Sequence, residues 1–581
     1  MYEYIDRMEA GMTEGERDAL RRIYEPTVVC IPPADSRRDL CVMKNGELRA
    51  YEAFYGSEER VRRPLAYLSS VDGGISWKRH DACGMMRAAT YVERAGMYIS
   101  IATEYNGESG LWVLRSAIGP GDPNPEIIEL SRACYGDVFL PKASAFTDRI
   151  WFTSQRWGAG EELPVATYHY SDDFGKTWNV SEVNRPDGAR IVFPHKGHRW
   201  HIRSGVEPYV EELSEARMAM MIRSPHDAFY ISYSEDGGES WSDPVLSTFY
   251  GTNTTPFMLR MRDGRVVTLW NNTRPLPERN YRKDCSEGGK RLARGRGEDV
   301  FTNRDAAHAA ISEDGGRTQI GYREILLNPI RGAADFRYRG SPDSSHDKSV
   351  HQFQAFELPY GKLLISVGQN EASRRLLIMD VKWLYETERR EDFLGGLEQL
   401  TTHTYVKSNV GSTVSAVGNG HCAYNRAQNA YLLPDPDRVG EVLYICKRHD
   451  DRLINDIGGV TWNFPASARG RVTVELKLLE KQARVSLADR WYNTCDPYIP
   501  MTAPFWFEVD ASELDGEWAT LTVDYDTEEG LAVLSVNGEE RFCVSMTALC
   551  PTGISYLILQ CATDGDSRGF YVRRMEKTDR K

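Results

Sequence analysis

The sequence predicts an all-β protein, a six-bladed β-propeller followed by a β-sandwich. Three observations lead to this prediction: an octapeptide that recurs between residues 70 and 319, the spacing of its copies, and a change to plain alternating strands after about residue 400. The chain has 581 residues, more than a single hydrophobic core usually serves, so two or more domains are expected.

The recurring octapeptide has the form Ser-x-Asp-x-Gly-x-x-Trp. Copies read SVDGGISW from residue 70, SDDFGKTW from 171 and SEDGGESW from 234, and a fourth, SEDGGRTQ from 312, has Gln319 in place of Trp. Ser and Asp side chains that bond nearby backbone, with a Gly that takes positive φ, indicate a hairpin turn. Because this role is structural, no catalytic function is expected for Asp72, Asp173, Asp236 or Asp314.

The spacing of the copies indicates the number of blades. A four-stranded blade needs roughly 40 to 60 residues, so the interval between the copies at 70 and 171 has room for a blade without the octapeptide. The interval before 312 contains a polar, Gly- and Arg-rich insertion, NYRKDCSEGGKRLARGRGED. Strand signals continue to about residue 385, and six blades fit residues 1–385 better than seven.

A second domain follows the octapeptide region. Residues 386–403 are expected to be a linker and residues 404–581 a β-sandwich, because segments such as RVTVELKLLE and APFWFEVD alternate in hydrophobicity and Asn537-Gly538 marks a hairpin. The strand order resembles a laminin-G or concanavalin-like sandwich. Such a domain either binds glycans or packs on the propeller for stability or dimerisation, and the sequence leaves both open.

Composition narrows the classes of partner. A net charge of −13 disfavours binding to nucleic acid and to anionic membranes. No apolar run is long enough to cross a bilayer. The first residues lack a secretory pattern, so a cytoplasmic location is expected.

The 11 Cys show no zinc-binding spacing and are expected to be reduced. No cofactor and no metal are predicted, and the oligomeric state stays undetermined.

The octapeptide is the Asp-box, and residues 30–385 resemble the sialidase superfamily. In that family a Glu acts as base to a Tyr nucleophile, and three Arg residues grip the carboxylate of the substrate. The segment GVEPYVEELSEARMAMMIRS resembles the family's Glu and Arg hairpin, which implies Glu207 as a catalytic carboxylate and Arg223 as a carboxylate ligand. A planar guanidinium suits a carboxylate because two parallel N–H bonds can form.

Further substrate-binding residues follow from the same resemblance. Arg304 precedes the box residue Ser312 by the family's offset, and Asn271 lies on the strand before it. Of the neighbouring Arg37 and Arg38, Arg38 is the better match for the first of the family's three carboxylate-binding Arg residues, although its offset is a residue or two shorter than in the family. The general acid is not identified, since Glu52, Glu58 and Glu59 all read as loop charges.

One departure concerns the nucleophile. Counting back from Gly361, the position of the family's Tyr holds Gln352, beside His351. A Tyr-based retaining mechanism is therefore not expected, and His351 is a candidate general acid or base because imidazole titrates near neutral pH. Gln352 is expected to contact substrate.

A histidine-rich segment precedes Glu207. His195, His198 and His201 are spaced by three in FPHKGHRWHIRSG, a pattern that permits metal binding but lacks the HExxH arrangement. A loop over the site is the preferred interpretation, in which His201 and Arg203 help to hold a sugar.

The resulting expectation is an exo-acting glycosidase that removes a terminal, acidic sugar from an oligosaccharide or glycoside by a mechanism without Tyr. Two alternatives stay open. One is another carbohydrate activity on the same scaffold, such as a uronate lyase or a rhamnosidase that uses His351. The other is a glycan-binding propeller without catalysis.

Overall fold

The computed structural model describes residues 1–32, 40–53, 64–81, 86, 88–105, 107–136, 138–157, 164–184, 206–224, 226–251, 254–276, 304–329, 349–368, 373–405, 426–451, 453–514, 516–562 and 568–580. It is an all-β fold, as the sequence predicts. No helix in these ranges is long and apolar enough to cross a membrane.

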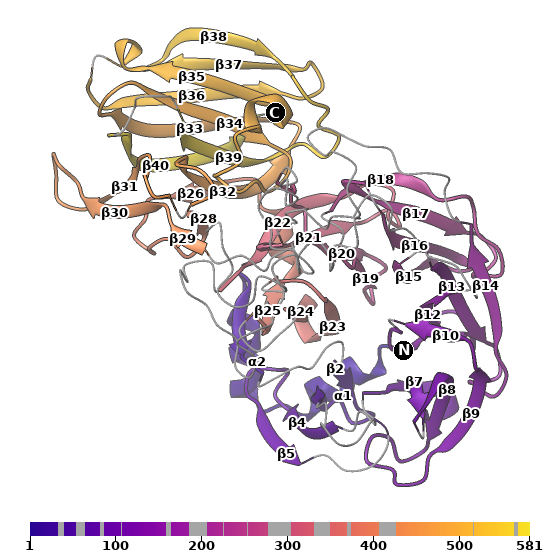
Figure 1. Cartoon of the computed structure of the whole chain (residues 1–581). Helices are drawn as coiled ribbons and strands as arrows, with labels where there is room; N and C mark the ends of the chain where they lie inside the picture. Colours follow the sequence, from indigo (N-terminus) through magenta and orange to yellow (C-terminus); the bar gives the residue numbers. More distant parts are fainter. Residues whose placement is uncertain are drawn as a thin grey trace.

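Six antiparallel sheets, each built mainly from consecutive strands, follow one another around a centre (Figure 1). The first three contain β2 (Leu40–Val42), β3 (Leu48–Ala53), β4 (Pro64–Ser70) and β5 (Lys78–Asp81); β6 (Thr90–Val92), β7 (Met97–Tyr105), β8 (Glu108–Ser116) and β9 (Glu126–Ser131); and β10 (Cys134–Gly136), β11 (Lys142–Ala143), β12 (Ile150–Trp157), β13 (Val165–Ser171) and β14 (Asn179–Val183). The second sheet is the one expected in the long interval between the first two octapeptides.

The other three sheets complete the set. They contain β15 (Val206–Ser214), β16 (Arg217–Arg223), β17 (Ala228–Ser234) and β18 (Val245–Tyr250); β19 (Phe257–Arg260), β20 (Val266–Trp270), β21 (Ala306–Ser312) and β22 (Ile320–Leu327); and β23 (Gln354–Leu358), β24 (Lys362–Val367), β25 (Arg375–Asp380) and β1 (Thr27–Cys30). The sixth sheet thus takes a strand from the start of the chain. Gln354 joins it to the first sheet by hydrogen bonds with the backbone N–H and C=O of Leu40.

The octapeptides form the turns between the third and fourth strands of four sheets. In the copy at 312, Ser312 donates to Asp314 at 2.8 Å and accepts from the Gly316 N–H at 2.8 Å, and Gly316 has φ +84°. This copy lacks the Trp and still forms the turn, in which the Thr318 hydroxyl also donates to Asp314 at 2.7 Å. A related turn closes β8 and β9, where Ser116 bonds Asp122 and the Gly119 N–H.

The Asp314 turn predicts an acid-dependent contribution to stability. The Thr318 N–H is the main cause that lowers the pKa of Asp314 from 3.8 to about 2. Because the folded-state pKa is below the unfolded value, the ionised form stabilises the fold; this contribution is present above about pH 4 and is lost as the pH falls to about 2. The difference in unfolding free energy between wild type and Asp314→Asn should therefore shrink over that interval in denaturant titrations. A difference that does not vary with pH would contradict this assignment.

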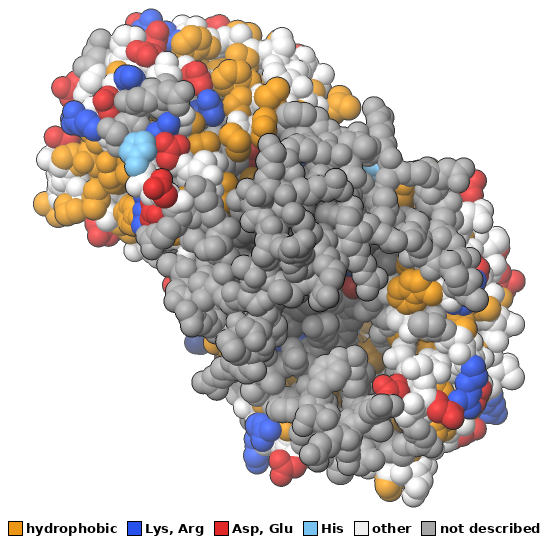
Figure 2. All heavy atoms as spheres, in the orientation of Figure 1, with side chains coloured by type: hydrophobic (Ala, Val, Ile, Leu, Met, Phe, Trp, Pro, Cys, Tyr) orange, Lys and Arg blue, Asp and Glu red, His pale blue; other side chains and the backbone are white. Residues whose placement is uncertain are grey.

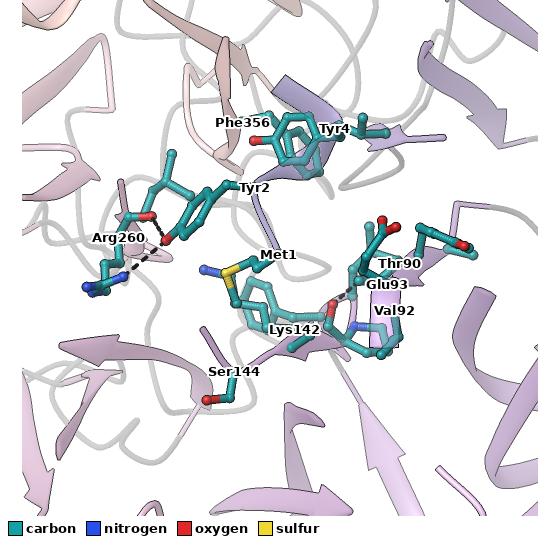
Figure 3. A pocket seen from close by; sticks show the side chains of 18 of the residues that line it. Met1, Tyr2, Tyr4, Thr90, Val92, Glu93, Lys142, Ser144, Arg260 and Phe356 are labelled. Carbon is teal, nitrogen blue, oxygen red and sulfur yellow. Dashed lines mark hydrogen bonds between the residues drawn. The ribbon is translucent and has the colours of Figure 1, made fainter. Parts of the chain in front are cut away.

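One central cavity of about 150 Å³ is lined by residues from all six sheets, which belong to β2, β6, β11, β15, β19 and β23. Figure 3 shows that Met1, Tyr2 and Tyr4 reach into it from the N-terminal segment, and Tyr2 donates to the Arg260 carbonyl at 3.0 Å. Tyr4 belongs to α1 (Glu3–Gly11), which is followed by α2 (Glu14–Arg22); the strand pattern predicted neither helix. A capping box between Thr13 and Glu16 starts α2.

The C-terminal unit consists of two antiparallel sheets around one core, in which Trp462, Leu476 and Phe505 are fully buried. One sheet contains β26 (Arg389–Glu391), β30 (Ala430–Pro434), β31 (Glu441–Ile445), β33 (Arg469–Leu478), β36 (Ala519–Asp526), β37 (Leu531–Val536), β38 (Glu539–Ser545) and β40 (Phe570–Asp579); the other contains β27 (Leu400–Thr401), β32 (Gly458–Ser467), β34 (Gln482–Ala488), β35 (Phe505–Asp510) and β39 (Ile554–Cys561). A short helix, α6 (Ile499–Thr502), and a separate ribbon of β28 (His403–Tyr405) and β29 (Arg426–Gln428) accompany them.

The expected linker at 386–403 needs correction. β26 pairs with β40 and β27 pairs with β32, so both belong to the C-terminal sheets, which begin before residue 404. Strands of two or three residues have too few positions to show an alternating pattern, which is why the sequence did not reveal them.

The two units share a buried interface at the fifth sheet. Ala306 and Leu327 form one apolar cluster with residues of the C-terminal unit, including Trp491 and Tyr556. Backbone bonds join the units as well: the Arg274 N–H donates to the Trp491 carbonyl at 2.8 Å. The C-terminal unit therefore packs directly on the fifth sheet, whose third strand, β21, begins two residues after Arg304.

Candidate active site

The predicted Glu207 and Arg223 meet at one end of the fourth sheet. Arg223 Nη1 donates to Glu207 Oε2 at 2.6 Å, and Thr255 Oγ1 donates to the same oxygen at 2.7 Å. Both ion-pair side chains are largely buried, 8% exposed for Glu207 and 12% for Arg223. The predicted hairpin is confirmed, since β15 and β16 pair antiparallel.

Glu207 sits on a distorted part of its strand. The register passes from Val206↔Arg223 to Tyr209↔Met221, which leaves one extra residue in β15. Such a bulge re-aims a side chain and is frequent beside active sites. Glu207 also has φ +49°, a left-handed conformation that is uncommon for residues other than Gly and recurs at functional sites. Gln155 Oε1 accepts from the Glu207 N–H at 2.9 Å and fixes this backbone.

A second group forms where the fifth and sixth sheets adjoin. Arg304 Nη1 lies 3.5 Å from His351 Nε2, and Gln352 Nε2 lies 3.3 Å from the same nitrogen. His351 Nδ1 lies 2.6 Å from Ser349 Oγ. The structure thus brings three predicted residues together: Arg304, His351 and Gln352.

We assign the tautomer of His351 from the donors around it. The guanidinium and the amide nitrogen are both donors, so Nε2 must be the acceptor and Nδ1 carries the proton, donated to Ser349. As arranged, His351 offers a lone pair toward Arg304. It is therefore suited to accept a proton and not to donate one from Nε2. Gln352 holds φ +68°, the second left-handed residue among the predicted site positions.

Asn271 lies beside the second group. It is fully buried, and its Nδ2 donates to the Ala306 carbonyl at 2.7 Å and the Val350 carbonyl at 2.8 Å. These bonds tie the start of β21 to the segment before His351, and the expected contact of Asn271 with substrate stays a prediction.

All these residues lie at the same end of their sheets. Glu207 and Thr255 stand at or before first strands, Arg223 ends a second strand, and Arg304 precedes a third strand. The octapeptide turns follow the third strands and so occupy the opposite end. The lining of the cavity in Figure 3 does not include Glu207, Arg223, Arg304 or His351.

Three predicted residues, Arg38, His201 and Arg203, lie outside the described residues, as do Glu58 and Glu59. Within the described ranges, no group of three or more His, Cys, Asp or Glu side chains is placed to hold a metal ion. Sequence reasoning missed Thr255 and Asp305. Thr255 gave no signal apart from its place before a strand, whereas Asp305 follows Arg304 directly.

The comparisons agree with the octapeptide analysis. Residues 136–324 match the BNR repeat-like domain family, and they include the octapeptide copies at 171, 234 and 312. This part of the chain is therefore similar to a BNR repeat-like domain, in agreement with the recurring motif. No curated protein shows detectable sequence similarity to the chain.

Several solved structures are similar to this chain. Trypanosoma rangeli sialidase is 11% identical with a TM-score of 0.35, covering 94% of this chain and 92% of that chain. The same sialidase in complex with sialic acid is 12% identical with a TM-score of 0.35, covering 97% and 94%. NanB sialidase from Streptococcus pneumoniae, in complex with a substituted ethanesulfonate, is 10% identical with a TM-score of 0.35, covering 64% and 73%.

Proposed function

We propose that this protein is an exo-acting glycoside hydrolase of the sialidase superfamily that removes a terminal, acidic sugar from an oligosaccharide or glycoside. The observation that carries the proposal is Glu207: a buried carboxylate on a strand bulge, at the same end of the sheets as Arg223 and Arg304. A site that only bound an acidic sugar would gain nothing from a carboxylate beside its arginines.

Arg223 and Arg304 are the proposed ligands of the substrate carboxylate. A guanidinium presents two parallel N–H donors that match a carboxylate, and both side chains already lie among polar partners of the site. Arg38, Arg203 and His201 are proposed to join them.

The proposed reaction is hydrolysis without a covalent Tyr intermediate. A glutamine amide is no nucleophile, so Gln352 cannot take the place of Tyr. Glu207 would remove a proton from water, whose oxygen attacks the anomeric carbon as the glycosidic C–O bond breaks. The leaving oxygen takes a proton from a general acid, and the product has inverted configuration.

A second candidate is β-elimination at a uronate whose O4 is linked to another sugar. It is favoured by the Nε2 lone pair of His351 beside Arg304. His351 would remove the C5 proton next to the carboxylate while Arg304 stabilises the developing negative charge. The C4–O bond to the neighbouring sugar would then break to leave a C4–C5 double bond, and the departing oxygen would take up a proton. The product would absorb in the ultraviolet, which distinguishes it from a hydrolysis product.

The test is an assay against oligosaccharides that end in sialic acid, uronic acid, rhamnose or arabinose, followed by mass spectrometry and NMR. We expect release of a terminal acidic sugar with inverted anomeric configuration. An unsaturated product would favour the second candidate. If no oligosaccharide is cleaved but one binds, the protein is a glycan-binding propeller and the catalytic assignment is wrong.

A further inference from the structure

Asp305 is the most heavily bonded carboxylate at the interface between the units. Arg426 donates to it through Nη2 at 2.5 Å and Nε at 3.2 Å, and the Tyr405 hydroxyl donates at 2.5 Å. His403 Nε2 lies 3.0 Å from Oδ2, and Asn328 Nδ2 donates to Oδ1 at 2.7 Å. Three of these four partners come from the β28–β29 ribbon of the C-terminal unit.

The negative charge of Asp305 is neutralised by the buried guanidinium of Arg426. Its side chain is 0% exposed and that of Arg426 is 1% exposed. Burial alone would raise the pKa of Asp305, but the charge of Arg426 and the His403 bond outweigh it and hold that pKa far below the usual value. A buried ion pair of this kind contributes little net stability compared with apolar packing, and its best-attested use is to fix one arrangement.

The arrangement that it fixes includes Arg304. Adjacent residues of an extended chain point to opposite sides, and here Arg304 contacts His351 while Asp305 contacts the C-terminal ribbon. The Arg304 carbonyl also accepts from the Val350 N–H at 2.9 Å, and the Asp305 carbonyl accepts from the Asn328 N–H at 2.7 Å. The backbone on which Arg304 stands is thus held from both sides.

The same alternation recurs one strand away. Asn271 braces the site, and the next residue, Asn272, is held by the C-terminal unit: its Nδ2 donates to the Asp489 carbonyl at 3.0 Å, and its own carbonyl accepts from the Trp491 N–H at 2.9 Å. On both strands, a residue of the site is followed by a residue that the C-terminal unit anchors.

We infer that the C-terminal unit completes the site, with Asp305 as a positioning residue that sets Arg304 through the β28–β29 ribbon. The inference rests on the proposed function for the role of Arg304. On this inference, the C-terminal unit positions a substrate-binding residue of the first unit, so binding of the acidic sugar requires both units.

The first test compares Asp305→Asn with Asp435→Asn in the full chain. Asp435 is also a carboxylate with a buried side chain, 1% exposed, and it is paired with Arg573 by two bonds inside the C-terminal unit. If Asp305 positions Arg304, Asp305→Asn should raise KM for the acidic substrate about tenfold or more, because a small displacement of a binding group is costly. Asp435→Asn should leave KM unchanged. Equal KM values for both variants and wild type would overturn the inference.

A milder pair covers the case in which Asp305→Asn does not fold. Tyr405→Phe removes one donor to Asp305, whereas Tyr525→Phe removes a hydroxyl that contacts Ser467 at 2.9 Å within the sandwich. Only Tyr405→Phe should raise KM. A purely structural role would lower the amount of active enzyme and leave KM alone.

Crystal structures of the variants separate this inference from the proposed function. Loss of the contact between Arg304 and His351 in Asp305→Asn, or in Tyr405→Phe if the former does not fold, supports positioning even if no substrate is ever cleaved. Retention of that contact with an unchanged Arg304 overturns it, whatever the activity.

Discussion

Replacing Glu207 with Gln should lower kcat about a hundredfold to ten-thousandfold, the range typical of a lost general base. The amide keeps the size of the side chain and still accepts hydrogen bonds from Arg223 and Thr255, but it cannot take a proton from water. Because Glu207 does not hold the sugar in the proposed mechanism, KM should change little. Steady-state kinetics on the substrate found in the oligosaccharide assay measures both constants.

Glu212→Gln is the matched control for this substitution. Glu212 lies on the same strand, β15, and is likewise buried, but its carboxylate bonds Ser144 and the Ala145 N–H near the octapeptide end. We expect its kcat to stay at the wild-type value. If Glu207→Gln also keeps the wild-type kcat, Glu207 is not the base.

Replacing Arg304 with Lys should weaken binding of acidic substrates and spare neutral ones. Lys keeps the positive charge but presents a single point donor in place of a planar fork. A hydrogen bond to a charged group contributes about 1.5–3 kcal/mol, so KM should rise about tenfold to a hundredfold. The measurement is KM for the acidic substrate.

The control for Arg304→Lys uses a modified substrate instead of a second protein variant. A derivative whose carboxylate is converted to an amide offers no charge to Arg304, so wild type and variant should bind it about equally weakly. An equal loss on both substrates would show that Arg304 acts on something other than the carboxylate.

Local patterns predicted the turns and the strand hairpins well, because their determinants are close in sequence. The octapeptide turn is held by Ser312, Asp314, Gly316 and Thr318 within seven residues, so even the copy with Gln319 forms it. The hairpin from Glu207 to Arg223 was likewise readable from its two strand-like runs. The sheet at residues 90–131 was inferred from interval length alone, since its Ser116 and Asp122 turn departs from the motif.

The parts that sequence reasoning missed depend on distant partners. Asp305 meets Arg426 across 121 residues, and nothing near either residue indicates the other. Asn271 was expected to contact substrate because its strand resembles that of the sialidase family, and its bonds to the Ala306 and Val350 carbonyls, 35 and 79 residues away, were not foreseen. The linker expected at 386–403 failed for the same reason, since β26 gains its identity only from β40.

The most direct test of the central claim is to cleave an acid-terminated oligosaccharide in heavy-oxygen water and weigh the products. Hydrolysis at the anomeric carbon predicts a released terminal sugar that carries one heavy oxygen from solvent, formed by wild type and hardly at all by Glu207→Gln. An unsaturated product without the label, or no release from any acid-terminated substrate, would contradict the account.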